Sequence, residues 1–337
     1  MGKKQLWIAL GLVLFGAVML FWPQDEDAEK RYFRNEGFVF GTTYSIQYEA
    51  EADLSVQIKG ALDAVDTSLS MFNEQSVLSR INRNEAVETT GDFEKVYLVA
   101  REVSEVSGGA LDITIAPLVN LWGFGLKHRE HVTPAMVDSL LPLVNYQGIT
   151  LDNHHISKTN PAITLDCGAV AKGYGCDKVV EVLRANGVEN LLVEIGGEVV
   201  AIGKNSKGQP WTIGITKPTD DPVGEQRNLQ DIVQTEYICM ATSGNYRNFY
   251  YDGSERRSHT IDPRTGYPVT HNLLAATVVA ENCARADALA TACMVLGADE
   301  AVKMIDRLDD AACYLIVSGQ DGFEVLHSAK WTLTEKN

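Results

Sequence analysis

Two common ligand-binding signatures are missing from this sequence. No two of its six cysteines form a Cys-x-x-Cys pair, which argues against a structural zinc site. Neither a Walker A motif nor a Gly-x-Gly-x-x-Gly fingerprint occurs, so the two best-known phosphate loops are excluded. The cysteines have apolar neighbours, and we expect them to be buried free thiols. They are Cys167, Cys176, Cys239, Cys283, Cys293 and Cys313.

Positive charge is also scarce. The formal net charge of the 337 residues is -16, which argues against a nucleic-acid-binding surface. A phosphate-bearing ligand would therefore need local help from a metal ion, helix N-termini or a few cations. The sequence shows no internal repeat and no low-complexity tract, and its length suits one large domain or two average ones.

The N-terminus carries a long apolar run. Lys3 and Lys4 precede apolar residues 6–22, and acidic residues follow. We expect residues 1–23 to be a membrane anchor or signal segment, with the rest of the chain on the outer side, and residues 24–35 to be a polar linker. An uncleaved anchor is favoured, because no Ala-x-Ala cleavage site and no lipid-carrying cysteine follows the run.

Beyond this linker, helix and strand patterns alternate irregularly. Residues 54–69 and 96–106 have helical spacing, and residues 163–166 predict a short strand before a helix that ends near residue 187. Residues 191–202 predict a strand pair broken at two glycines. Because a regular βαβ rhythm is missing, we expect a mixed α+β fold.

A carboxylate and a hydroxyl stand one helical turn apart near the C-terminus. Asp287 and Thr291 lie in an Ala-rich segment that predicts a helix, so they share one face. Two hard oxygen donors suit Mg²⁺. On spacing alone, a buried Asp that accepts a hydrogen bond from Thr291 is the simpler interpretation.

Two other stretches carry chemistry. The turn Cys167-Gly168-Ala169-Val170-Ala171-Lys172 precedes a helix and offers backbone amides and one cation to an anion, although glycine there is often only a matter of geometry. Residues 258–266 gather His259, Asp262 and Arg264, which can titrate or bind phosphate. A structural role explains that cluster equally well. Trp122 and Phe124 could stack on a flat ligand or simply pack in the core.

Taken in order, these stretches resemble the FAD:protein FMN transferase family, the ApbE-type flavin transferases. The most specific match is Leu-Asp-Cys-Gly-Ala-Val-Ala-Lys-Gly-Tyr at residues 165–174. The ordered set covers most of the chain from about residue 37 to residue 326. The matching stretches are 112–125, 165–174, 195–198, 242–246, 259–266 and 286–292.

The resemblance implies a Mg²⁺-dependent reaction. FAD binds, its pyrophosphate is cleaved, AMP leaves, and FMN is joined through its phosphate to a threonine of a target protein. The implied targets are subunits of a membrane sodium-pumping NADH:quinone reductase or a related electron-transport complex, with a Ser/Thr-Gly-Ala-Thr type site. The implied fold for residues 36–330 is a two-part body with FAD in the cleft. The implied place is the periplasmic side of a bacterial inner membrane.

The resemblance also implies roles for single residues. Asp287, Thr291 and the backbone carbonyl of Ala169 match the metal ligands. His259 and Asp166 are alternative catalytic bases, and metal-assisted deprotonation of the threonine is a third route. Phe40 and Phe72 replace the family's usual Met and Tyr, so a hydrogen bond from a phenol is lost there. The implied FAD-site positions are Phe40, Phe72, Ala110, Leu111, Asp112, Asp166, Lys172, Ser258 and His259.

Two rival functions fit nearly the same residues. In an FAD pyrophosphatase, water replaces the threonine and FMN and AMP are released. A non-catalytic, membrane-tethered flavin-binding protein would hold FAD intact. The sequence also departs from the family at the N-terminus, where the usual lipid-bearing cysteine is missing, and this favours a protein anchor facing the same compartment.

Overall fold

An eight-stranded sheet forms the centre of the computed structural model, which describes residues 30–125, 132–218, 229–245, 249–252, 255–320 and 322–333. All neighbouring strands in this sheet are antiparallel. In spatial order the strands are β1 (Arg31–Val39), β2 (Thr42–Ala50), β5 (Leu191–Ile195), β6 (Glu198–Ile202), β9 (Tyr237–Gly244), β12 (Leu273–Val279), β13 (Ala312–Ser318) and β14 (Phe323–His327).

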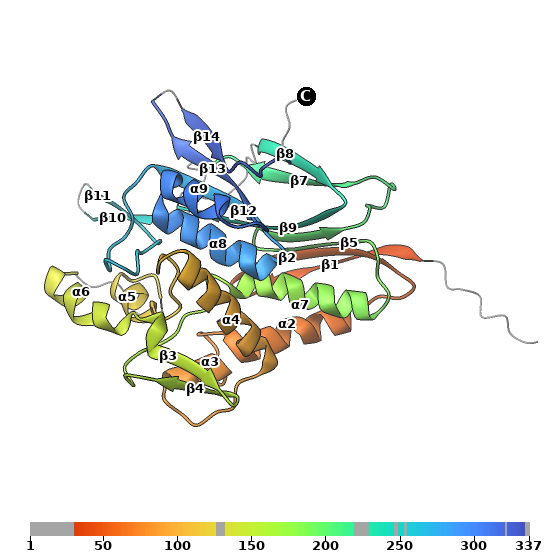
Figure 1. The fold of residues 1–337 in the computed structure, drawn as a ribbon. Coiled ribbons are helices and arrows are strands. Elements are labelled where there is room, and N and C mark those ends of the chain that lie inside the picture. Colours follow the sequence, from red (N-terminus) through yellow and green to blue (C-terminus); the bar gives the residue numbers. More distant parts are fainter. Residues whose placement is uncertain are drawn as a thin grey trace, which may run out of the picture.

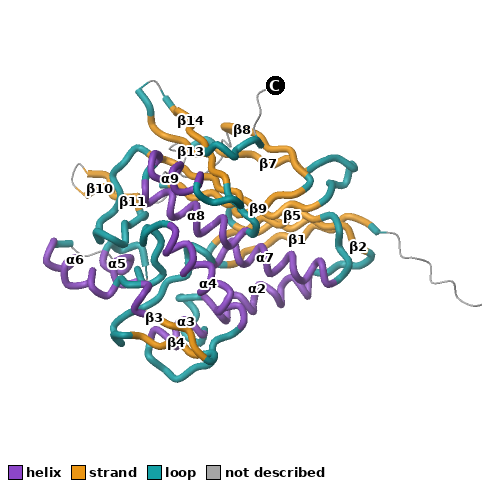
Figure 2. Tube along the Cα trace, in the orientation of Figure 1, coloured by secondary structure: helices purple, strands orange, loops and turns teal. Residues whose placement is uncertain are grey.

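Helices cover one face of this sheet, and a small hairpin covers the other (Figure 1). The helical layer is made by α2 (Ser55–Leu69), α4 (Gly91–Val106), α7 (Ala171–Ala185), α8 (Cys283–Leu296) and α9 (Ala298–Asp306). The hairpin of β7 (Trp211–Thr216) and β8 (Leu229–Thr235) packs on the opposite face through Trp211, Ile213 and Val233. In Figure 2 the helical layer is purple, and the sheet and the hairpin are both orange.

Shorter elements lie to the left of and below the helical layer in Figure 1. They are α3 (Val77–Asn82), α5 (Ala116–Leu121), α6 (Pro134–Leu140), the 3-10 turns Leu141–Leu143 and Tyr146–Gly148, and the two-stranded pairs β3 (Ile149–Asp152) with β4 (His155–Lys158) and β10 (Phe249–Asp252) with β11 (Glu255–Ser258).

Helix α8 lies at the heart of the helical layer. Nearly all of its side chains are buried, because small Ala residues on every face let other elements approach closely. It contacts α7, α4 and α9 on the helix side, and β9 and β12 of the sheet. A helix buried on all sides fixes its polar residues firmly in place.

The mixed helix–strand fold expected from the sequence is confirmed, and helices segregated on one face of an antiparallel sheet make it an α+β arrangement. The helix predicted over 54–69 and the broken strand pair at 191–202 are also confirmed. All six cysteines are buried and free, as expected.

Two sequence expectations differ from the structure. Residues 163–166 form no strand, because the backbone of Leu165 bonds to the side chain of Asn82 and the Asp166 amide donates to the Ile113 carbonyl. Strand β1 begins at Arg31, inside the range 24–35 expected to be a linker, because residues 31–39 pair with β2 along their whole length.

The predicted membrane segment, residues 1–23, lies outside the described residues. Within the part of the chain that the structure describes, no helix has the length and apolar character needed to cross a membrane.

Candidate active site

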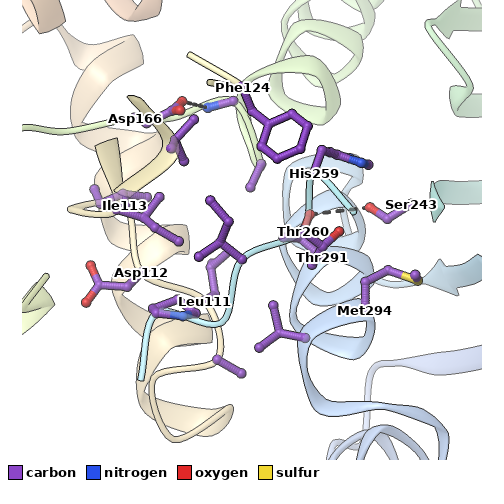
Figure 3. A pocket seen from close by; sticks show the side chains of 18 of the residues that line it. Leu111, Asp112, Ile113, Phe124, Asp166, Ser243, His259, Thr260, Thr291 and Met294 are labelled. Atoms are coloured by element: carbon purple, nitrogen blue, oxygen red, sulfur yellow. Dashed lines mark hydrogen bonds between the residues drawn. The ribbon is translucent and has the colours of Figure 1, made fainter. Parts of the chain in front are cut away.

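A cavity of about 340 Å³ opens where α8 meets three loops. Figure 3 shows Leu111, Asp112 and Ile113 on one side and Ser243, Thr291 and Met294 on the other, with Phe124 and His259 close together. Segments far apart in sequence therefore supply its walls. The other lining residues named below are Ala110, Asp166, Gly168, Ala169, Lys172, Thr260 and Asp287.

A second cavity of about 140 Å³ adjoins the first. The two share Asp166, Gly168 and Lys172, so the glycine-rich turn before α7 forms the boundary between them. The second cavity is lined by apolar side chains from α2 and the loop after it, and by Phe40 and Phe72. Phe72 is 75 % exposed, so its ring is available for a ligand instead of belonging to the core.

Phe40 reaches the second cavity from a strained turn. The β1–β2 hairpin has a two-residue loop in which both Phe40 (φ 51°) and Gly41 (φ 76°) have positive φ. A bulky residue in the left-handed region is unfavourable, and such strain concentrates at functional sites. Opposite the ring, a Cβ on Gly175 would lie only 2.6 Å from Phe40 Cε2, so a larger residue there would displace the ring.

Helices α7 and α8 cap each other. The N-cap of α7 is Val170, whose apolar side chain cannot accept from the amides of the first turn. The Gly173 amide donates instead to Asp287 Oδ2 of α8 (3.0 Å). In return, Asp177 of α7 accepts from the amides of Cys283 and Ala284 at the start of α8 (2.9 and 2.8 Å). Burial raises the pKa of Asp177 to about 6 despite these bonds. This double cap fixes Asp287 against the turn.

Three charged groups meet beside that cap. Lys172 Nζ lies 2.7 Å from Glu198 Oε1 and 3.6 Å from Asp287 Oδ1, and both carboxylates are almost fully buried. Burial raises the pKa of Asp287, and it raises the pKa of Glu198 to about 8. Burial lowers the pKa of Lys172, but the two carboxylates outweigh it, so the net shift is upward. Two buried acids share one ammonium, which leaves the cluster short of positive charge.

Thr291 lies one turn beyond Asp287 and is 3.3 Å from the hydroxyl of Ser243 on β9. The expected helix face is thus confirmed, but Thr291 pairs with Ser243 instead of making the simple Asp–Thr bond that spacing alone suggests. No group of three or more His, Cys, Asp and Glu residues suited to a metal occurs among the described residues. One carboxylate with hydroxyl and carbonyl oxygens still suits Mg²⁺, which keeps several waters and binds substrate phosphates.

Asp166 and Ala169 belong to the turn between the cavities. Asp166 Oδ1 accepts from the Gly168 amide (2.8 Å), and burial raises the pKa of Asp166. Ala169 lines the larger cavity together with Asp287 and Thr291, as the predicted metal set requires.

Asp112 has a structural role. Its carboxylate accepts from the amide and hydroxyl of Thr114 (2.8 and 2.6 Å) and from the Tyr146 amide (2.8 Å), and it points away from the cavity in Figure 3. Burial raises its pKa. These bonds hold Ala110 and Leu111, which line the cavity, in position.

His259 and Ser258 behave differently from each other. His259 lines the cavity edge-on to Phe124, with ring centroids 6.3 Å apart. Ser258 is buried and does not line either cavity; its hydroxyl accepts from the Thr260 amide (3.2 Å). Thr260 in turn donates to Asn245 Oδ1 (2.5 Å), which ties this loop to the end of β9.

Comparisons with known proteins point to a single family. The family model described as the ApbE family matches residues 40–315. The FAD:protein FMN transferase of Haemophilus influenzae is 37 % identical over 325 residues, which cover 91 % of this chain and 93 % of that protein. The flavin transferase ApbE from Vibrio cholerae has a similar structure, with a TM-score of 0.81, 34 % identity and coverage of 90 % of this chain and 99 % of that one.

The chain belongs to the ApbE family. A further ApbE structure, the apo form of the Pseudomonas stutzeri flavinyl transferase, has a TM-score of 0.82 at 30 % identity and covers 91 % of this chain and 98 % of that one. The family resemblance drawn from the ordered motifs is therefore confirmed.

Sequence reasoning missed several residues of this ApbE site. Ser243, Glu198 and Asp177 were given no role, although the first two lie in motifs that match the family. Ser243 follows Thr242 near the end of a strand, and Glu198 directly follows a Gly-Gly turn. Polar residues at strand ends are a usable signal. Asp177 stands in mid-helix, and only the packing of α8 shows what it does.

Proposed function

We propose that this chain is an FAD:protein FMN transferase that moves FMN from FAD to a threonine hydroxyl of a target protein and releases AMP. One observation carries the proposal: Asp287, Thr291 and Lys172 line one cavity, and Lys172 also lines the cavity that adjoins it. The curated relatives of that name, which match most of the chain, support the same class of enzyme. FAD is a long molecule with a pyrophosphate in its middle, and two cavities joined at an oxygen-rich centre suit its two ends.

Mg²⁺ fits the donors at this junction. Asp287 Oδ2 is occupied by the Gly173 amide, whereas Oδ1 has only the long 3.6 Å contact with Lys172. Asp287, Thr291 and the Ala169 carbonyl would hold the cation, and substrate phosphates and water would complete its shell. When bound, the cation would supply the positive charge that this acidic protein needs to hold the pyrophosphate of FAD.

Residues of the chain would contact both the phosphates and the flavin ring of FAD. Lys172 would sit beside the phosphates as a fixed cation, and Phe40 and Phe72 would contact the flavin ring in the smaller cavity. The threonine oxygen would form a bond to the phosphorus on the riboflavin side, while the bond from that phosphorus to the bridging oxygen breaks and AMP leaves with that oxygen.

The proton of the threonine hydroxyl needs an acceptor. His259 lines the cavity, and histidine is the side chain that most often transfers protons in enzymes, so it is the first candidate. Asp166 is the alternative, because its carboxylate lies at the junction. His259→Asn with full transfer rates would leave Asp166 or solvent water as the acceptor.

We also propose the cellular setting. Residues 1–23 would anchor the chain in a bacterial inner membrane with the catalytic domain on the periplasmic side. The targets would be subunits of a sodium-pumping NADH:quinone reductase or a related electron-transport complex. The apolar run after two lysines and the family resemblance support this setting.

The decisive experiment mixes the chain with FAD, Mg²⁺ and an acceptor carrying a Ser/Thr-Gly-Ala-Thr type site. Intact mass of the acceptor and chromatography of free nucleotides are read together. The proposal predicts an acceptor heavier by one phosphate-linked FMN and an equal amount of AMP, both lost in Asp287→Ala. Free FMN with AMP and an unmodified acceptor indicates a pyrophosphatase, and intact FAD with every acceptor tried indicates a binding protein.

A further inference from the structure

We propose that Glu198 is a positioning residue that holds the ammonium of Lys172 away from Asp287 and so keeps Asp287 open to the cation. The inference rests on the proposed Mg²⁺ site and adds to it a residue outside the donor set. Its basis is an asymmetry. Lys172 Nζ is 2.7 Å from Glu198 Oε1, a charge-assisted hydrogen bond, but 3.6 Å from Asp287 Oδ1, which is too long for one.

The two oxygens of Asp287 are not equally open. Its Oδ2 already accepts from the Gly173 amide at the start of α7, so Oδ1 has more acceptor capacity to offer a cation. The nearest competitor for Oδ1 is Lys172, whose flexible side chain starts on the same turn of α7. A small shift of Nζ would close the contact and place an ammonium where the cation belongs.

Glu198 is built to prevent that shift. It is the first residue of β6 and is paired with Ile195 across a turn in which Gly196 and Gly197 have φ of 62° and 104°, so its backbone is fixed by a tight hairpin. The side chain is 2 % exposed. Its Oε2 atom is buried and has no hydrogen-bond partner among the described residues. A buried carboxylate in this state depends on Lys172 for charge compensation, which commits the ammonium to Glu198.

The position of the Lys172 ammonium therefore depends on Glu198. While Glu198 holds the ammonium at 2.7 Å, Lys172 stays beside the phosphate site without blocking the carboxylate that receives the metal. Without the Glu198 carboxyl group, Asp287 becomes the better partner for Lys172, and the cation and the ammonium compete for one oxygen.

The test measures Mn²⁺ binding to the full chain without FAD, by the electron paramagnetic resonance signal of free Mn²⁺, which replaces Mg²⁺ at oxygen sites. Glu198→Gln keeps the side-chain shape and is expected to weaken Mn²⁺ binding about tenfold, whereas Lys172→Met should strengthen it. The double variant should bind Mn²⁺ within about threefold of Lys172→Met alone, because Glu198 acts only through Lys172. Glu181→Gln is the matched control, since Glu181 is an exposed residue of α7 paired with Lys95.

Two results would overturn the inference: Glu198→Gln binding Mn²⁺ like the parent, or losing the same factor in the Lys172→Met background. The second would mean that Glu198 acts on the cation directly. If Glu198→Gln fails to fold, Lys172→Met alone decides. An unchanged affinity of Lys172→Met for Mn²⁺ would then refute the competition between the ammonium and the cation. Asp287→Ala distinguishes a failure of this inference from a failure of the proposed metal site. Unchanged Mn²⁺ binding in that variant would refute the metal site itself.

Discussion

At the scale of single residues, Gly173 decides how closely α7 approaches α8. A Cβ at this position would lie 2.2 Å from the Cys283 carbonyl oxygen and 2.8 Å from Asp287 Cβ. The first neighbour is backbone and cannot move aside. The Gly173 amide could then no longer reach Asp287 in its present geometry.

We therefore expect Gly173→Ala to lower the free energy of unfolding by about 2 kcal/mol or more and to abolish transfer. Gly60→Ala is the control, because Gly60 is exposed within α2 and no described heavy atom lies within 4 Å of its Cβ position. That change should raise the free energy of unfolding by about 0.5–1 kcal/mol. Urea unfolding measures both, and equal effects would contradict the close-approach argument.

Gly175 tests the smaller cavity in the same way. Its added Cβ would meet the end of the Phe40 ring, a side chain that can yield. Gly175→Ala should change the free energy of unfolding by less than about 1 kcal/mol while raising the KM for FAD several-fold, because the ring moves within the flavin cavity. Steady-state kinetics at saturating acceptor give the KM. An unchanged KM would mean that Phe40 does not contact the flavin.

The residue scale also shows where sequence analysis succeeds. Asp287, Thr291, Lys172 and Ala169 were named from motifs, and the structure brings them to one cavity. Motifs carry such information because they keep chemistry and local backbone together. Asp112 was named for the same reason, yet its carboxylate serves the loop, since a motif does not say which way a side chain points.

At the scale of elements, the carboxylate of Asp92 ties α4 to α7. Asp92, in the first turn of α4, accepts from Tyr174 (2.6 Å) and Lys178 (2.8 Å) of α7. Burial raises the pKa of Asp92, but Lys178 and Tyr174 outweigh it, and the net shift is downward from 3.8. An acid with a lowered folded pKa stabilises the fold above its unfolded pKa and loses that contribution as pH falls through the folded value.

Asp92→Asn should therefore lower the free energy of unfolding by about 1.5–3 kcal/mol at pH 7, the usual range for hydrogen bonds to a charged group. The difference from the parent chain should shrink as pH falls below 3.8 toward the lowered value. Denaturant titrations at neutral and acid pH supply the comparison. A difference that stays constant with pH would show that the effect does not come from ionised Asp92.

Elements with strong local patterns were predicted well, among them α2, α8 and the β5–β6 pair. Residues 163–166 were not, because a β-rich tetrapeptide cannot reveal that Asn82 and Ile113 take its hydrogen bonds. The reciprocal capping of α7 and α8 is equally invisible in sequence, since it depends on two helices more than a hundred residues apart meeting in one orientation.

At the scale of the whole molecule, net charge makes the cation necessary. A chain of charge -16 repels a pyrophosphate, and Lys172 is already paired with Glu198. Removing divalent cations with a chelator should weaken FAD binding about tenfold or more and stop transfer, and added Mg²⁺ should restore both. FAD fluorescence titration follows the binding. Full transfer of FMN in the presence of the chelator would contradict the claim that a divalent cation neutralises the pyrophosphate.

The most direct test of the account is a crystal structure of the chain with FAD and Mn²⁺. The account predicts one FAD across both cavities, its flavin beside Phe40 and Phe72, and an anomalous peak at about 2.2 Å from Asp287 Oδ1 and Thr291 Oγ1. A cation bound away from Asp287, or an FAD that leaves either cavity empty, would contradict it.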